Sequence, residues 1–249
     1  MGDQKDPVPL SSPPPYSPPV VEMQPSVATA PPQPNAPVPI GWLSPNTTNL
    51  LGLQYLMELD YLSVKQTFGL LQFFSGRDTG NNYVVMDISG EPVFYVAIES
   101  SFFSRLLSCE TPTFEFIVYD RYRLQEILRM IRLFNSKTLE VYSGNTLLGS
   151  VTQEWSHCEI VFYIRDASGQ PVLIIKNISR FCQIIFKVES TDDEHSVGTI
   201  QQQSSDGSCF NISELSFDIN FPRDLDVKMK ALLLGAYLFL DVTNYGKRR

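Results

Sequence analysis

Few side chains in this sequence could perform covalent chemistry. His157 and His195 are its two histidines. His157 is the chain neighbour of Cys158, and adjacency in sequence does not indicate a nucleophile and base arranged in space. The four cysteines lie far apart and form no CxxC pair, which argues against a zinc site and favours free thiols. We therefore expect no conventional enzyme active site.

Residues that could bind a protein partner lie near the N-terminus. Pro13, Pro14, Pro15 and Tyr16 spell the PPxY ligand of WW domains, and Pro15 and Pro18 give the PxxP spacing that SH3 domains read. The alternative is a solvated spacer that binds nothing. The motif predicts WW- or SH3-domain partners.

The segment that presents this motif differs in composition from the rest of the chain. From residue 6 to residue 45, prolines recur together with Ser, Ala, Thr and Val. Such a composition buries too little apolar surface to offset the entropy of ordering, and it favours polyproline II. The sequence therefore predicts a disordered, proline-rich arm over residues 1–49.

Charge and targeting signals narrow the partners further. The formal net charge is -8, and the longest basic cluster is residues 247–249. A chain with this excess of negative charge repels phosphate backbones, which argues against nucleic acid as a main partner. Near the N-terminus, acidic residues and prolines stand where a signal peptide would have its apolar stretch. We expect a location on the cytosolic side of a membrane or in the cytosol.

Beyond residue 50 the chain predicts a mainly β domain. Short runs rich in β-branched and aromatic residues are separated by turn-forming residues at regular spacing, which is typical of a sandwich or barrel. The predicted strands cover residues 83–87, 93–98, 114–119, 138–142, 147–153, 159–165, 171–176, 182–188, 196–201 and 215–221. Residues 123–134 depart from this pattern, because the apolar positions from Leu124 to Ile131 recur at helical spacing.

A single apolar helix closes the domain. Pro222 breaks the last strand, Asp224 can cap the helix, and Asp226 favours its dipole in the first turn. These signals predict a helix over residues 225–240. A bilayer span needs about 20 apolar residues, so we expect a helix buried by its own sheet. The positions that would fill the sheet or enter a membrane are Ala231, Leu232, Leu233, Leu234, Leu238, Phe239 and Leu240.

Several stretches together resemble the phospholipid scramblase family. They are Gly52 to Asp60 with its Tyr55 and Leu56, then residues 81–83, and above all the run of residues 221–231. The resemblance covers most of residues 50–241. It implies a Tubby-like fold, a closed antiparallel β-barrel of about twelve strands around a hydrophobic C-terminal helix. The domain would then span residues 50–243, followed by a short basic tail of residues 244–249, and residues 123–134 would be mostly strand.

The resemblance also implies calcium binding by a segment just before the last helix, which aligns with residues 213–224. Calcium needs six or more oxygen ligands, and the family's two leading aspartates are missing here. The ligands that remain are Ser213, Glu214, Asp218 and Asp224. In the alternative, Asp224 only caps the helix while Glu214 and Asp218 face solvent. The palmitoylated cysteine run of the family is also absent, its place being shortened to residues 133–135.

Two functions follow from these observations. The resemblance implies calcium-dependent, ATP-independent movement of phospholipids between membrane leaflets, at the cytoplasmic face of the plasma membrane, with the C-terminal helix inserted or lining a lipid path. The proline-rich arm instead favours a non-transporting cytosolic adaptor that recruits WW- or SH3-domain partners.

Overall fold

The computed structural model describes residues 52–67, 82–100, 114–122, 124–132, 136–156, 159–179, 184–192, 195–203 and 216–245. The predicted arm with its PPxY motif lies outside the described residues, as do all four cysteines, Ser213 and Glu214.

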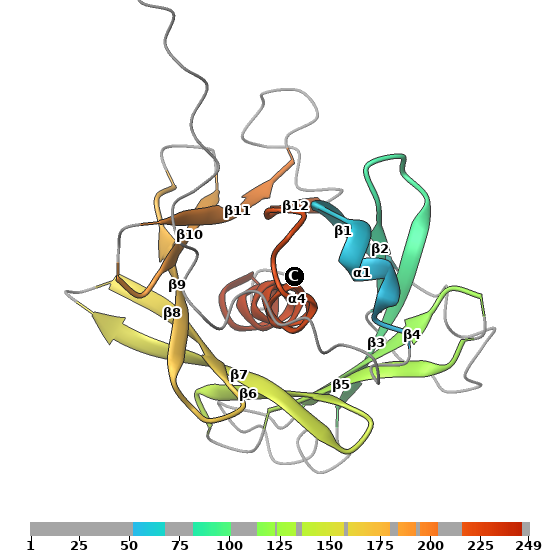
Figure 1. The fold of residues 1–249 in the computed structure, drawn as a ribbon, viewed down its shortest axis with the longest axis horizontal. Helices are drawn as coiled ribbons and strands as arrows, with labels where there is room; N and C mark the ends of the chain where they lie inside the picture. The colour runs from blue at the N-terminus through green and yellow to red at the C-terminus, as the bar shows by residue number, and fades with distance from the viewer. Residues whose placement is uncertain are drawn as a thin grey trace, which may run out of the picture. The chain divides into compact units, whose positions relative to one another are not determined.

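Twelve strands form one closed barrel in the described part of the chain (Figure 1). Each strand pairs antiparallel with the next one along the chain, and β12 closes the barrel on β1, where Ile219 lies opposite Leu62. Closure leaves no edge strand whose backbone groups lack partners. The closed antiparallel barrel that the family resemblance implies is thus confirmed. The strands are β1 (Tyr61–Thr67), β2 (Asn82–Met86), β3 (Pro92–Ser100), β4 (Phe114–Asp120), β5 (Glu126–Arg132), β6 (Thr138–Ser143), β7 (Thr146–Ser156), β8 (Glu159–Asp166), β9 (Pro171–Asn177), β10 (Ile185–Ser190), β11 (Ser196–Gln202) and β12 (Ser216–Asn220).

One end of this barrel, which we call the α1 end, gathers the short connections. Helix α1 (Gln54–Glu58) leads into β1 there. The up-and-down strand order brings the turns after β2, β4, β6, β8 and β10 to the same end, and residues 221–226 connect β12 to the last helix there. Segments from both halves of the chain therefore meet at the α1 end.

Helix α4 (Val227–Leu240) runs through the centre of the barrel (Figure 1). All but one of its residues are buried. The ring of Phe239 meets that of Phe162 edge to face, with 5.8 Å between the centroids, and the ring of Tyr237 lies 5.2 Å from that of Phe217. A helix that is apolar on every side needs apolar neighbours all round, and the inward side chains of the strands supply them. The predicted central helix is confirmed.

The start of α4 differs from the prediction. The helix begins at Val227, and its N-cap is Asp226, whose Oδ1 accepts a hydrogen bond of 2.7 Å from the backbone N–H of Lys228. Asp224 is exposed and lies two residues earlier. The backbone N–H of Leu225 donates to the carbonyl of Pro222 over 3.1 Å, so residues 222–225 form a turn before the helix can start.

Residues 126–132 form β5, so the helix that periodicity alone predicts there is wrong and the strand implied by the resemblance is confirmed. Backbone pairing with β4 on one side and β6 on the other holds the segment extended. Leu128 and Met130 are fully buried in the core, while Arg129 lies on the outer face and pairs with Glu115 at 2.5 Å. Tertiary pairing here overrides local periodicity.

Candidate functional site

A lysine is buried at the α1 end. Lys230 in α4 is 0% exposed, and the three N–H groups of its Nζ are shared among four backbone carbonyls within hydrogen-bonding distance. These belong to Leu59 at 2.6 Å, Arg223 at 2.7 Å, Leu56 at 2.9 Å and Met57 at 3.3 Å. Since a buried ammonium needs acceptors to replace water, this arrangement ties α4 to the end of α1 and to the loop before the helix.

The surroundings of Lys230 work against its charge. Burial lowers the pKa of Lys230 to about 8, and the positive charge of Arg223 acts in the same direction, while the carboxylates of Asp224, Asp60 and Asp226 raise it. The ammonium also lies 5.2 Å from the centroid of the Phe221 ring, a cation–π contact that favours the charged form. Lys230 is therefore a charged tether that is held at an electrostatic cost.

Of the predicted calcium ligands, only Asp218 and Asp224 are described. Asp218 is buried rather than facing solvent. Its Oδ1 accepts from the hydroxyl of Tyr61 at 2.6 Å, and both of its oxygens accept from Nε2 of Gln203, at 2.8 and 3.0 Å. Burial and this hydrogen bond from the phenol to Asp218 raise the pKa of Tyr61.

The two described carboxylates interact with protein groups. Both oxygens of Asp218 are already acceptors for protein donors, while Asp224 is exposed and has its electrostatic effect on Lys230. Among the residues that the structure describes, no group of three or more His, Cys, Asp or Glu side chains could hold a metal ion. Calcium takes six or more oxygens, and Ser213 and Glu214 lie outside the described residues, so the predicted calcium site stays a prediction.

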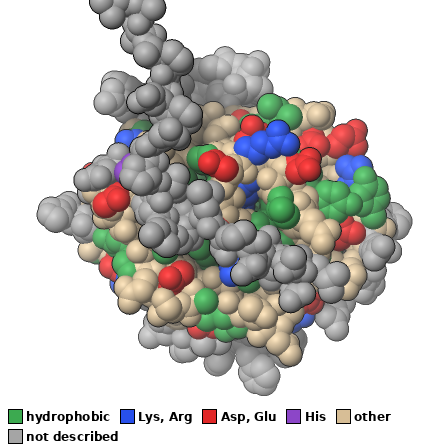
Figure 2. All heavy atoms as spheres, viewed as in Figure 1, with side chains coloured by type: hydrophobic (Ala, Val, Ile, Leu, Met, Phe, Trp, Pro, Cys, Tyr) green, Lys and Arg blue, Asp and Glu red, His purple; other side chains and the backbone are tan. Residues whose placement is uncertain are grey.

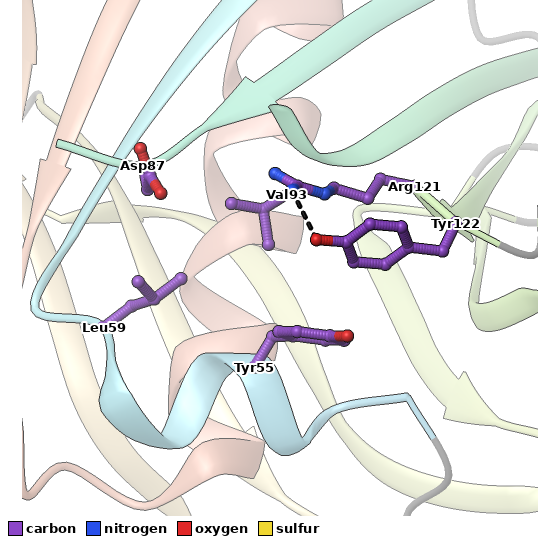
Figure 3. Close-up of a pocket in the computed structure, with 6 residues that line it drawn as sticks. All are labelled: Tyr55, Leu59, Asp87, Val93, Arg121 and Tyr122. Atoms are coloured by element: carbon purple, nitrogen blue, oxygen red, sulfur yellow. Dashed lines mark hydrogen bonds between the residues drawn. The ribbon is translucent and has the colours of Figure 1, made fainter. Parts of the chain in front are cut away.

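A surface pocket of about 220 Å³ opens at the α1 end (Figure 3). Its walls come from four separate segments, namely α1 with the residue after it, the turn after β2, strand β3 and the turn after β4. In Figure 3, Arg121 and Tyr122 lie on the right of the pocket and Asp87 on the opposite side. The lining residues are Tyr55, Leu59, Asp87, Val93, Arg121 and Tyr122.

Arg121 provides the positive side of the pocket. Its Nη1 donates to the carbonyl of Pro92 at 2.7 Å, its Nη2 donates to the hydroxyl of Tyr122, and its guanidinium carbon lies 4.3 Å from the centroid of the Tyr122 ring. An ion pair to Glu91 is longer, at 3.7 Å. A guanidinium has five N–H donors, so further donors remain for an anion.

Asp87 provides the negative side and is positioned by its own turn. Its Oδ1 accepts from the backbone N–H groups of Ser89 at 2.8 Å and Glu91 at 3.0 Å. Such side-chain to backbone bonds are typical of Asp at the start of a turn, and Gly90, at φ +79°, takes the left-handed position that the turn requires.

The sequence predicted none of this pocket as a site. The run from Asp87 to Gly90 was visible as a turn between two strands, and Tyr55 as part of the family resemblance. Their convergence with Arg121 and Tyr122 depends on barrel register, which a single sequence does not reveal. The buried role of Lys230 was missed for the same reason.

The residues assigned to the helix core or to a membrane all lie inside the barrel. Within the described ranges, no helix combines the length and the apolar character that crossing a membrane requires. The following are each 0% exposed: Ala231, Leu232, Leu233, Leu234, Leu238, Phe239 and Leu240.

Comparisons with known proteins cover the whole barrel. A family model described as Scramblase matches residues 41–247. Phospholipid scramblase 4 of Homo sapiens is 30% identical over 230 residues, which make up 84% of this chain and 69% of the relative. Phospholipid scramblase 2 of Bos taurus is 29% identical over 230 residues, with 84% of this chain and 77% of the relative covered. A solved structure of a protein from Arabidopsis thaliana is similar with a TM-score of 0.45 and 13% identity, over 78% of this chain and 99% of that one.

Proposed function

The chain belongs to the scramblase family, and from this premise we propose that it moves phospholipids in both directions between the leaflets of a membrane without consuming ATP. The observation that supports this proposal most is the extent of the family match, which includes every described strand and α4. We place the activity at the cytoplasmic face of the plasma membrane. The protein would act as a transporter of lipids and not as a conventional enzyme.

Calcium enters the proposal as a condition to be tested. The family resemblance implies calcium dependence, but Asp218 and Asp224 do not assemble a site among the described residues. No step of the proposed transport is therefore assigned to calcium. Matched measurements with calcium and with a chelator decide whether the activity depends on the ion.

The test of transport uses the full chain in liposomes. Fluorescently labelled phospholipid is placed in both leaflets, and a membrane-impermeant reductant quenches the outer one. Active protein makes the whole labelled pool quenchable, with or without ATP, whereas protein-free vesicles lose only the outer-leaflet signal. Vesicles with heat-unfolded protein control for leakage. Quenching that stays at the protein-free level with and without calcium refutes the proposal.

Helix α4 offers a sharper test of how lipid would move. We propose that the buried helix is the resting state and that transport requires α4 to leave the barrel. A bilayer core is about as apolar as leucine side chains, so the leucines of α4 would lose little transfer free energy on moving from the barrel into a membrane. Lys230, in contrast, would lose its four carbonyl acceptors. The lysine tether is then one restraint on release, beside the apolar side chains of the strands, which α4 now covers and which lipid would have to cover in its place.

A disulfide can lock α4 in place. A Cβ at Gly235 would lie 3.2 Å from Val141 Cγ2, close enough for a bond between cysteines at both positions. The double variant Gly235→Cys with Val141→Cys is made in a protein whose four native cysteines are replaced by serine. The same cysteine-free protein without the two new cysteines is the matched control. We expect the oxidised protein to lose transport and to regain it on reduction. Equal transport by the oxidised form contradicts release of the helix.

A second function rests on Pro13 to Tyr16. We propose that this PPxY motif recruits WW-domain proteins to the membrane face where the barrel acts, because such ligands bind in an extended polyproline conformation that the surrounding composition favours. The test is a pull-down with isolated WW domains, comparing the native chain with Tyr16→Ala. Pro18→Ala is the matched control and also probes the SH3 spacing. Equal recovery of WW domains by native chain and Tyr16→Ala removes the motif from consideration.

A further inference from the structure

The pocket at the α1 end combines groups of opposite charge with aromatic walls. Arg121 and Asp87 face it from opposite sides (Figure 3). Leu59 and Val93 supply apolar surface between them. A small ligand that carries a negative and a positive group would be complementary to both sides of this pocket.

The aromatic walls favour a large, weakly hydrated cation at one side. The rings of Tyr55 and Tyr122 lie 6.2 Å apart between centroids and are tilted by 39°, so they form an open wedge and not a closed stack. These tyrosines are 47% and 64% exposed, so ring surface is accessible from outside. An exposed aromatic face attracts quaternary ammonium groups. Arg121 already stacks on the Tyr122 ring, so the ring of Tyr55 is the one that offers such a face, and the Asp87 carboxylate lies across the pocket from it (Figure 3).

The size of the pocket limits the ligand. About 220 Å³ is below the range of roughly 300–1,000 Å³ that drug-sized ligands occupy. A whole phospholipid with its acyl chains does not fit, whereas a headgroup does. The chains would then have to remain outside, in a membrane next to the α1 end.

Apolar side chains around the pocket suit such a membrane. Large hydrophobic residues are exposed at six described positions, and four of these lie at the α1 end: Tyr55, Tyr122, Met57 at 50% and Ile88 at 77% exposure. Figure 2 shows hydrophobic side chains beside acidic and basic ones on the face seen from the same side as in Figure 1. Exposed apolar side chains around a polar pocket are typical of a surface that touches a partner or a bilayer.

We propose that this pocket binds the phosphocholine headgroup of a phospholipid at a bilayer surface. The phosphate accepts hydrogen bonds from Arg121, and the quaternary ammonium rests against the exposed ring of Tyr55, with the Asp87 carboxylate across the pocket adding negative charge. This assignment rests on the proposed lipid transport and names the class of lipid that the barrel contacts. It also predicts no preference for serine headgroups, because their extra carboxylate would add negative charge to a pocket that already contains Asp87.

The present partners of Arg121 leave room for this role. Its ion pair with Glu91 at 3.7 Å involves side chains that are 29% and 66% exposed, and exposed pairs of this kind contribute little. The bond to the Pro92 carbonyl holds the guanidinium in place without using all of its donors. A phosphate would therefore replace a weak partner and leave the positioning bond intact.

The first test is binding of a soluble headgroup. Glycerophosphocholine is titrated into the native chain by calorimetry, and saturable binding is expected. Tyr55→Ala should weaken binding by about tenfold, which corresponds to a cation–π contact of about 1.4 kcal/mol, and Arg121→Gln should weaken it at least as much. Trp155→Ala is the matched control, since Trp155 is 67% exposed at the other end of the barrel, and it should bind normally.

The outcomes separate the alternatives. No saturable binding to the native chain overturns the proposal, and so does unchanged binding by Tyr55→Ala, which is a surface change that spares the turn held by Arg121. The proposal is also overturned if inorganic phosphate or glycerophosphoserine competes for the pocket as well as glycerophosphocholine does. The site would then recognise phosphate alone. Stronger binding of glycerophosphocholine than of these two probes supports it.

Vesicles connect the pocket to a membrane and to transport. Flotation with phosphatidylcholine vesicles should recover the native chain and lose Tyr55→Ala, and added phosphatidylserine should not increase recovery. Recovery that depends on phosphatidylserine overturns the headgroup assignment. If the native chain moves lipid but does not bind glycerophosphocholine, the pocket assignment alone fails. If it binds the headgroup but moves no lipid, transport alone fails and the pocket stands.

Discussion

Replacing Lys230 by Met removes the buried ammonium while keeping an unbranched side chain, and it should change how stability depends on pH. In the native protein burial lowers the pKa of Lys230 to about 8, whereas a lysine in the unfolded chain has a pKa of about 10.4. Below pH 8 both states hold the proton. Between these two values the unfolded state binds more protons, so the free energy of unfolding rises with pH.

The size of the effect follows from the two pKa values. Each pH unit in this window adds about 1.4 kcal/mol, and the window spans about 2.4 units, which gives about 3 kcal/mol in all. Lys230→Met lacks this contribution. The difference in unfolding free energy, native minus variant, should therefore grow by about 3 kcal/mol between about pH 7 and about pH 10.5.

Urea unfolding followed by circular dichroism, at a series of pH values, measures this difference. Other titrating groups are common to both proteins and cancel in the subtraction. Lys228→Met is the matched control, because Lys228 lies two residues away on α4 with a partly exposed side chain. A native-minus-variant difference that stays flat across this range refutes the reasoning. It would mean that the four carbonyls solvate the ammonium as well as water does.

Further substitutions test the helix and the barrel. Asp226→Ala should lower the unfolding free energy by about 1 kcal/mol through loss of the N-cap, while Asp224→Ala, measured in the same urea series, should cost clearly less. Leu232→Ala should lower it by about 2–5 kcal/mol, because it leaves a cavity between α4 and the barrel wall; a loss below 1 kcal/mol would contradict the packing of α4. A Cβ at Gly198 would lie 2.0 Å from the backbone oxygen of Asn220. Gly198→Ala should therefore disrupt the pairing of β11 with β12 and lower the melting temperature sharply. An unchanged melting temperature would refute that contact.

The strand-rich domain could be predicted because its signals are local and repeated, although they left sandwich and barrel open and only the family resemblance implied a closed barrel. Alternating apolar residues and regularly spaced turns indicate strands wherever they occur, and an apolar helix too short for a bilayer favours a place inside the sheet. Segment 126–132 shows the limit of such signals. Its apolar spacing fits both a helix and a strand, and pairing with β4 and β6 decides between them.

The sites were hidden because they depend on contacts between distant segments. The carbonyl of Leu56 that accepts from Lys230 lies 174 residues away along the chain. Lys230 therefore resembled one of the polar residues that bracket an apolar helix core. Tyr55 and Tyr122 are likewise far apart in the chain and meet only in the folded structure. The predicted start of α4 was two residues early because Asp224 and Asp226 are equally good capping residues by type.

Because β1 pairs with β12 around a helix that follows β12 in the chain, the order of synthesis matters for this protein. On the ribosome, eleven strands with apolar inner faces emerge before their closing partner, and all twelve emerge before the helix that fills them. Until α4 is released, the nascent chain exposes surfaces that aggregate readily. The long sequence separation of this closure also predicts slow folding, and a premature stop before α4 would leave a shell without a core, a substrate for chaperones and proteases.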